Sequence, residues 1–329
     1  MKIKQSQKPL IHEGAFLMSL HAFLKLVEIQ TKLASLFPFL VGSLFVFYRY
    51  DTFRPTNTLI FFCSMFLFDL TTTAINNYMD YRKATNEQYR KQKNIIGQEN
   101  IPEWLVITTI LCLLITATFL GIWLVFKTDM LVLVIGMICF AIGILYTFGP
   151  IPISRMPLGE IFSGVTMGFG ILFLTVYVNA FDKNIANLVW EGKMISFRAD
   201  LLQILEIVLV SIPCVTTIAN IMLANNICDL EEDIKNNRFT LPYYIGKKYA
   251  IYLFDALYLI AFFAIFVAVV LNLLPKIMSL ALLASIPVYK HVKLFNKKQI
   301  KSDTFVISVK NLVIINGVIS AILCLAVII

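Results

Sequence analysis

The run LLQILEIVLVSIPCVTTIANIML at positions 201–223 is followed directly by ANNICDLEED at positions 224–233. About 20 mostly apolar residues are enough to cross a bilayer as a helix. If the helix continues, Asn225, Asp229 and Asp233 lie four residues apart and share one face. Two carboxylates at such a short distance repel each other, and a bound cation relieves the repulsion. Because oxygen ligands favour a hard cation, the stretch predicts a membrane helix that ends in a Mg2+ site.

The composition of the whole chain supports a membrane protein. Of 329 residues, 59% are hydrophobic and only 15% are charged, which is too apolar for a soluble protein of this length. The apolar runs are continuous, whereas the strands of a membrane β-barrel alternate in polarity. The net charge of +8 does not indicate nucleic acid as a partner, because Lys and Arg lie in the short loops between apolar runs.

These runs predict an all-α, polytopic bundle of about nine transmembrane helices. The expected spans are 22–48, 57–80, 104–126, 130–148, 158–181, 201–223, 249–271, 277–292 and 311–329. We expect Pro38 to kink the first span, which also carries polar residues. Residues 1–21 are predicted to form a cytosolic or interfacial lead, followed by a single transmembrane domain at 22–329.

The distribution of basic residues predicts the orientation in the membrane. Loops after the even-numbered spans carry most of the Lys and Arg, including Lys83, Arg90, Lys235 and Lys301. By the positive-inside rule these loops face the cytoplasm, and so does the N-terminus. The protein is therefore expected in the cell membrane, with both acidic stretches at the cytoplasmic ends of their helices.

A weak internal repeat relates the two halves of the chain. Asn76 and Asp80 close the second span with the spacing that Asn225 and Asp229 have at the end of the sixth. This correspondence predicts two four-helix units around a central cavity, with the site between them. Two such clusters suit Mg2+ ions that hold a diphosphate while its apolar tail lies among the helices. For Asp80 alone, a solvated helix end is an equally good explanation.

Three stretches make the chain resemble the UbiA superfamily of intramembrane prenyltransferases. They are Asn76–Lys83, Tyr146–Glu160 and Asn225–Gly246, and they occur in the same order as in that family. The branch that the chain is most similar to is the 1,4-dihydroxy-2-naphthoate polyprenyltransferases of menaquinone biosynthesis. The resemblance implies transfer of a chain from a polyprenyl diphosphate to an aromatic acceptor, with loss of the naphthoate carboxylate to give demethylmenaquinone. Membrane lipid surrounds such an enzyme.

The resemblance also implies roles for individual residues. The catalytic residues are Asp80, Asp229 and Asp233, and the Mg2+ ligands are these three with Asn76 and Asn225. Lys83, Arg155, Lys235 and Arg238 are candidates for binding the diphosphate, although a charge that only sets topology explains each equally well. Substrate-binding candidates are Gln30, Lys32, Asn77 and Tyr146, with Glu28 beside them; packing at the interface explains Tyr146 equally well.

The first stretch departs from the family pattern. Asn77 stands where an acidic residue is usual, and the second aspartate after Asp80 is missing, with Ala84, Asn86 and Glu87 at the following positions. Other interpretations therefore stay open. They are the same fold with 4-hydroxybenzoate, a haem or a glycerol phosphate lipid as acceptor, a homologue without activity, and an ion-coupled transporter.

Overall fold

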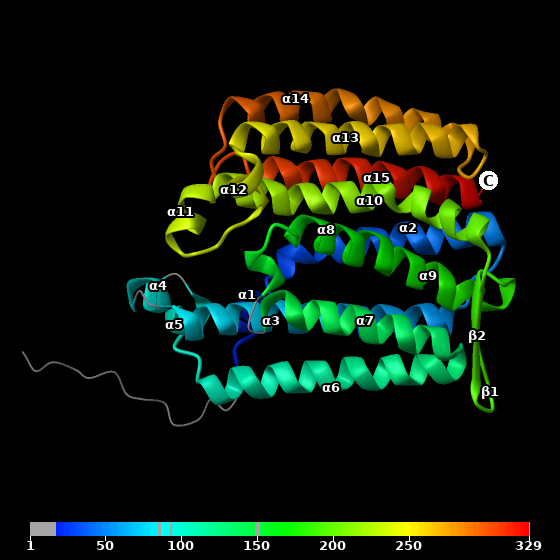
Figure 1. The fold of residues 1–329 in the computed structure, drawn as a ribbon, viewed down its shortest axis with the longest axis horizontal. Helices are drawn as coiled ribbons and strands as arrows, with labels where there is room; N and C mark the ends of the chain where they lie inside the picture. Colours follow the sequence, from blue (N-terminus) through cyan, green and yellow to red (C-terminus); the bar gives the residue numbers. More distant parts are fainter. Residues whose placement is uncertain (1–17, 85–86, 93, 149–151, 329) are drawn as a thin grey trace, which may run out of the picture.

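The protein is described by a computed structural model that covers residues 18–84, 87–92, 94–148 and 152–328. Its long helices run side by side and form one bundle (Figure 1). The helices that make up the spans are α2 (Leu33–Tyr50), α3 (Pro55–Lys83), α6 (Glu103–Lys127), α7 (Met130–Thr147), α8 (Gly159–Ser163), α9 (Ile171–Ala180), α10 (Leu201–Cys228), α13 (Lys247–Val270), α14 (Ser285–Lys297) and α15 (Val306–Ile328).

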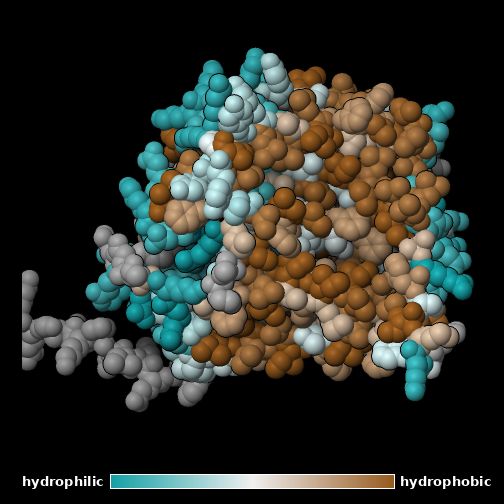
Figure 2. All heavy atoms as spheres, in the orientation of Figure 1, coloured by the Kyte–Doolittle hydropathy of each residue, from teal (hydrophilic) through white to brown (hydrophobic). Residues whose placement is uncertain are grey.

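The predicted number of spans is confirmed. In the described part of the chain, eight helical segments are long and apolar enough to cross a membrane, and Met130–Tyr146 is a shorter apolar helix. Figure 2 shows an apolar surface over the middle of the bundle, with hydrophilic residues gathered at its two ends. The all-α membrane fold is therefore the one that the sequence predicts, and the protein is an integral membrane protein.

The first span differs from its prediction. It is not one helix kinked at Pro38, which lies inside α2, but is broken between α1 (Leu20–Leu26) and a 3-10 helix at Ile29–Lys32. Glu28 takes a left-handed backbone conformation at the break, with a φ of 46°. A non-glycine residue rarely adopts this conformation unless the surroundings hold it there. Of the predicted lead, residues 1–17 lie outside the described residues.

The fifth span contains a π-helix at Gly164–Gly170, between α8 and α9. Its glycines allow the span to approach the backbone of α10 closely. A Cβ on Gly168 would lie 2.5 Å from the Cα of Val215, and one on Gly164 would lie 2.8 Å from the carbonyl oxygen of Val215. Small residues at such crossings allow tight packing of membrane helices.

The segment between the fifth and sixth spans, expected only to be polar, forms a β-hairpin. Strands β1 (Ala186–Glu191) and β2 (Met194–Ala199) are antiparallel, and Trp190 is opposite Ile195. The hairpin lies at one end of the bundle (Figure 1). The short helices α4 (Glu87–Gln92), α5 (Ile95–Gln98), α11 (Leu230–Lys235) and α12 (Leu241–Ile245) lie at the opposite end, where α3 and α10 finish. Both acidic stretches are therefore at the same end.

Candidate active site

The acidic stretch after α10 keeps the predicted spacing although the helix is interrupted. Asp229 lies between the end of α10 and the start of α11. The amide of Asp229 still donates to the carbonyl of Asn225 at 3.0 Å, and that of Asp233 donates to the carbonyl of Asp229 at 2.8 Å. These bonds have helical spacing, so the three residues stay in register across the interruption.

A lysine from a distant loop binds two of these residues. The ammonium of Lys301, in the loop between α14 and α15, donates to Asp229 Oδ2 at 2.6 Å and also contacts Asn225 Oδ1. Sequence reasoning assigned Lys301 only to membrane topology. Nothing in the sequence relates a residue in this loop to α10, because the contact depends on how the last helices fold back.

Asp233 is paired with a different cation. The residue is 4% exposed, and its Oδ1 lies 3.4 Å from Nε of Arg238. Its other carboxylate oxygen, Oδ2, is buried and has no hydrogen-bond partner. Burial raises the pKa of Asp233 above its ordinary value, and the positive charge of Arg238 opposes that rise. A buried carboxylate oxygen without a partner is costly, and a bound cation is one way to compensate it.

Arg238 connects the two acidic stretches. The carboxylate of Asp80, at the end of α3, interacts electrostatically with Arg238, Arg155 and Lys83. Since Arg238 is also paired with Asp233, one guanidinium acts on carboxylates from both halves of the chain. Lys235, by contrast, is exposed on α11. Asp80 therefore lies within electrostatic range of Arg155 and Arg238, at the end of the bundle where α3 and α10 finish.

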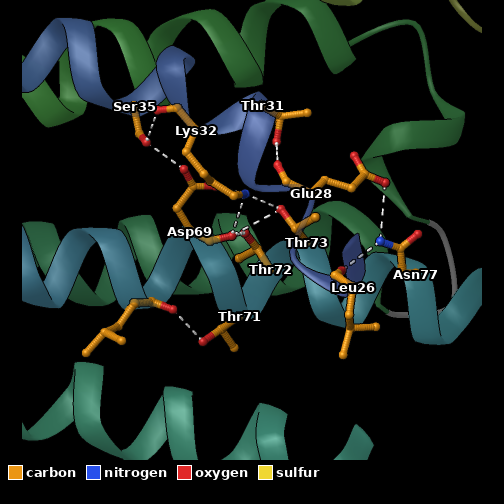
Figure 3. A network of polar contacts seen from close by, with 11 residues as sticks. Leu26, Glu28, Thr31, Lys32, Ser35, Asp69, Thr71, Thr72, Thr73 and Asn77 are labelled. Carbon is orange, nitrogen blue, oxygen red and sulfur yellow. Dashed lines mark hydrogen bonds and ion pairs between the residues drawn. The ribbon is translucent and has the colours of Figure 1, made fainter. Parts of the chain in front are cut away.

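Asn77, the unusual residue of the first stretch, is bound to the break in the first span (Figure 3). Its amide nitrogen donates to the carbonyl of Leu26 at 2.9 Å and to the carboxylate of Glu28 at 3.2 Å. The break frees backbone carbonyls that need partners in an apolar environment. An acidic side chain at position 77 has no N–H to donate, so the geometry explains why an amide suits this position. Glu28 in turn acts electrostatically on Asp80.

Lys32 lies deeper in the bundle and is fully engaged (Figure 3). Its ammonium donates to Asp69 Oδ1 at 2.8 Å, to the carbonyl of Asp69 at 3.2 Å and to Thr73 Oγ1 at 2.6 Å. Ser35 donates to the other carboxylate oxygen of Asp69 at 2.6 Å. Gln30, by contrast, is exposed. A substrate role for Lys32 and Gln30 stays a prediction, and the network shows that Lys32 already ties the first span to α3.

Tyr146 lies at the end of α7 and faces α10. Its hydroxyl is 3.5 Å from the sulfur of Met222, and Glu160 and Arg238 act on it electrostatically. Glu160 is 4% exposed and accepts a hydrogen bond from Asn226 at 2.8 Å, while its Oε2 is buried without a partner. Sequence analysis gave Glu160 no role of its own; its place in a Leu-Gly-Glu turn at the start of a span was the available signal.

The donor set suits a weakly held Mg2+ whose coordination is completed by water or by the substrate. Within residues 18–84, 87–92, 94–148 and 152–328, no three His, Cys, Asp or Glu side chains lie close enough together to hold a metal ion by themselves. Each stretch does offer carboxylate and amide oxygens, and Asn225 and Asp229 already bind the side-chain ammonium group of Lys301. Mg2+ is commonly bound by one or two carboxylates plus phosphate oxygens and water, so these residues fit it.

Several solved structures share the fold. A UbiA homologue from Aeropyrum pernix K1 has a TM-score of 0.65 at 17% identity, covering 88% of this chain and 97% of its own. A UbiA homologue from Archaeoglobus fulgidus, bound to DMAPP and Mg2+, has a TM-score of 0.62 at 13% identity, covering 94% and 99%. A digeranylgeranylglyceryl phosphate synthase has a TM-score of 0.61 at 17% identity, with the same coverage.

Sequence comparisons agree with the fold. A 1,4-dihydroxy-2-naphthoate octaprenyltransferase of Bacillus subtilis (strain 168) is 27% identical over 245 residues, which are 72% of this chain and 70% of the relative. The UbiA prenyltransferase family matches residues 35–313, far more than half of the chain. The chain therefore belongs to the UbiA prenyltransferase family, and both the family and the prenyltransferase class that its sequence predicts are confirmed.

Proposed function

We propose that the protein transfers a polyprenyl chain from its diphosphate to 1,4-dihydroxy-2-naphthoate, with Mg2+ as cofactor, to give demethylmenaquinone in its reduced, hydroquinone form. The observation that carries the proposal is the place of Arg238, which acts on carboxylates of both acidic stretches at one end of the bundle. The choice of acceptor is supported by the Bacillus relative. Residues 22–329 act as one domain in the cell membrane, with this end towards the cytoplasm.

The proposed chemistry needs charge stabilisation at the diphosphate and exclusion of water from the prenyl chain. Bound Mg2+, held by Asn76, Asp80, Asn225, Asp229 and Asp233 together with the substrate, would neutralise charge on the leaving diphosphate. Arg238, Arg155 and Lys83 donate to its phosphate oxygens as the carbon–oxygen bond breaks and the electron pair leaves with the diphosphate. The electron-rich ring of the acceptor attacks the allylic carbon, and the ring then loses its carboxylate as CO2.

The apolar interior of the bundle protects the allylic cation from water. Tyr146 stabilises the cation through the face of its ring. This role is supported by the position of its hydroxyl beside Gly159, at the start of α8, and by the electrostatic effect of Arg238 on it. Gln30 contacts the acceptor. Asn77 and Lys32 support the wall of the site through Leu26, Glu28 and Asp69.

The test is diphosphate release by the purified, detergent-solubilised protein, with a short isoprenyl diphosphate. Reactions with and without Mg2+ are run with dihydroxynaphthoate or 4-hydroxybenzoate, and the products are identified by mass. We expect Mg2+-dependent release that yields decarboxylated, prenylated naphthoate. Product from 4-hydroxybenzoate alone would overturn the acceptor while keeping the site. No release with either acceptor, from folded protein, would contradict the proposal.

A further inference from the structure

The loop that carries Lys301 is closed by its own hydrogen bonds. The carbonyl of Ile300 accepts hydrogen bonds from the amides of Asp303, Thr304 and Phe305 at 3.2, 2.9 and 3.1 Å. The hydroxyl of Thr304, which is buried, accepts from the amide of Ile300 at 2.8 Å. The loop is thus a closed turn, and Lys301, which follows Ile300, points its ammonium at the end of α10.

The ammonium of Lys301 has three partners at the acidic stretch. It bonds to Asp229 Oδ2 at 2.6 Å, contacts Asn225 Oδ1, and lies 4.8 Å from the centre of the Phe305 ring. It also acts electrostatically on Asp233. A positive charge therefore stands between the same amide and carboxylate oxygens that are predicted to bind Mg2+.

The pair is exposed enough to exchange. The side chain of Lys301 is 46% exposed and that of Asp229 is 25% exposed. Ion pairs this close to solvent contribute little free energy, because water and salt screen them. A divalent ion, with twice the charge, can take the oxygens of Asn225 and Asp229 from the ammonium. The displaced ammonium then remains within reach of the phosphates that such an ion binds.

We propose that Lys301 is a built-in cation of the active site: it competes with the divalent ion for Asn225 and Asp229 and binds the diphosphate once displaced. The inference rests on the proposed function, because it assigns the ligand of the same site. It gives Lys301 two effects of opposite sign. The ammonium weakens binding of the ion alone and strengthens binding of the diphosphate with the ion present. If Lys301 only stabilised the loop, its removal would weaken both the binding of the ion alone and the binding of the diphosphate.

The experiment measures the two effects separately on the full chain in detergent. Binding of Mn2+, used as the probe, is followed by the loss of the free-ion EPR signal in the absence of diphosphate. Binding of geranyl thiodiphosphate, a slowly reacting analogue, is measured by calorimetry in saturating Mg2+. Lys301→Gln removes the charge, Lys301→Met keeps the length of the stem, and Lys298→Gln removes an exposed lysine from the same loop.

We expect Lys301→Gln to bind Mn2+ about fivefold more tightly than the unchanged protein, which is the effect of removing a weakly held internal competitor. The same variant should bind the analogue about tenfold more weakly, as expected for the loss of one charged phosphate contact. Lys298→Gln should change neither. If Lys301→Gln does not fold, Lys301→Met decides the question with the same two measurements.

Two results in the Lys301 variants would overturn the inference. One is Mn2+ binding that stays the same or weakens in a folded Lys301 variant, and the other is unchanged binding of the analogue. An unchanged chain that binds no Mn2+ would overturn it as well. Because Mn2+ binding needs no prenyl transfer, the inference is decided even if the acceptor or the reaction proves different. Conversely, normal transfer together with unaltered Mn2+ binding in the variant would remove only the role of Lys301.

Discussion

At the scale of single residues, the two aspartates that follow α10 have different surroundings. Asp229 is partly exposed and shares an ammonium with Asn225, whereas Asp233 is buried and lies beside Arg238. Their roles in the proposed reaction are nevertheless the same, because each supplies negative charge to a bound cation. Neither side chain fills a large apolar volume, so neutralising it should remove charge and leave the packing intact.

Asp229→Asn and Asp233→Asn should each lower turnover about 100-fold or more, the scale seen when one group that stabilises transition-state charge is removed. Diphosphate release measures the loss, and size-exclusion chromatography with thermal unfolding checks that the variants fold. Glu231→Gln is the matched control, because Glu231 is exposed on the same short helix. Full activity in either aspartate variant would exclude the metal site proposed here.

Arg238→Gln should raise the KM for the prenyl diphosphate about tenfold, because it removes one charged contact to phosphate. Lys235→Gln should change the KM little, since Lys235 is exposed on α11. The two residues are three positions apart and look alike in the sequence. Steady-state kinetics distinguish them. Equal changes in KM would mean that Arg238 contributes only its positive charge and makes no specific contact with the phosphate.

At the scale of single elements, the buried pair of Lys32 and Asp69 joins the first span to α3. The side chains are 5% and 13% exposed, and their hydrogen bonds hold the segment that follows the break at Glu28. Removing one partner leaves a buried charge without compensation, which is the costly way to break such a pair.

Lys32→Met should therefore lower the free energy of unfolding by about 3 kcal/mol. The double variant Lys32→Met with Asp69→Leu should recover most of this loss, because a well-packed apolar pair can replace a buried ion pair. Reversible unfolding of the detergent-solubilised protein, followed by circular dichroism, gives both values. A double variant as unstable as the single one would mean that Thr73 and Ser35, rather than the charge, decide the stability of this contact.

The elements also show which features of the fold a sequence can predict. The nine spans follow from long apolar runs, whose ends are set by charged residues and turns, and most predicted bounds lie close to those found. The break at Glu28 could not be predicted, because it depends on a residue of another helix. The side-chain amide of Asn77 donates a hydrogen bond to the carbonyl of Leu26, which the break leaves free. The hairpin at 186–199 was hidden by the absence of clear alternation between polar and apolar residues.

The same distinction holds for the site. Asp80 lies within electrostatic range of Arg155 and Arg238 because α3 and α10 finish at the same end of the bundle. Lys301 was not predicted, because its contact with Asp229 spans residues 72 positions apart and follows from the return of the last helices. Local patterns single out the predicted acidic ligands and nearby cations such as Arg238, whereas a cation from a distant loop, such as Lys301, is known only from the packing.

At the scale of the whole molecule, the two ends of the bundle differ in chemistry. The end with α11 and α12 carries the candidate site, and the other end carries the hairpin with its exposed Trp190 and Phe197. If the positive-inside rule holds, the hairpin lies outside the cell and the site inside it. The proposed substrates would then enter from the cytoplasm.

Orientation can be tested by cysteine labelling in intact cells, in a background without the natural cysteines. Lys193→Cys, in the hairpin turn, should react with a membrane-impermeant maleimide. Lys298→Cys, in the loop beside the site, should react only after the cells are permeabilised. The reverse pattern would place the site outside the cell and contradict the proposed source of the substrates.

The π-helix at Gly164–Gly170 has a further consequence for how this chain tolerates change in length. A π-helix holds one residue more than an α-helix of the same length along the axis. Deletion of one residue from it would therefore restore α-helical spacing. The segments on either side would then keep their directions, whereas a deletion in α9 has no wide turn to absorb it and would rotate everything after it by about 100° about the helix axis. Asn179, which accepts hydrogen bonds from the amide of Arg54 and the hydroxyl of Thr58, would turn away from α3. The length of α9 is therefore fixed by these contacts, whereas the π-helix before it can lose one residue without moving them.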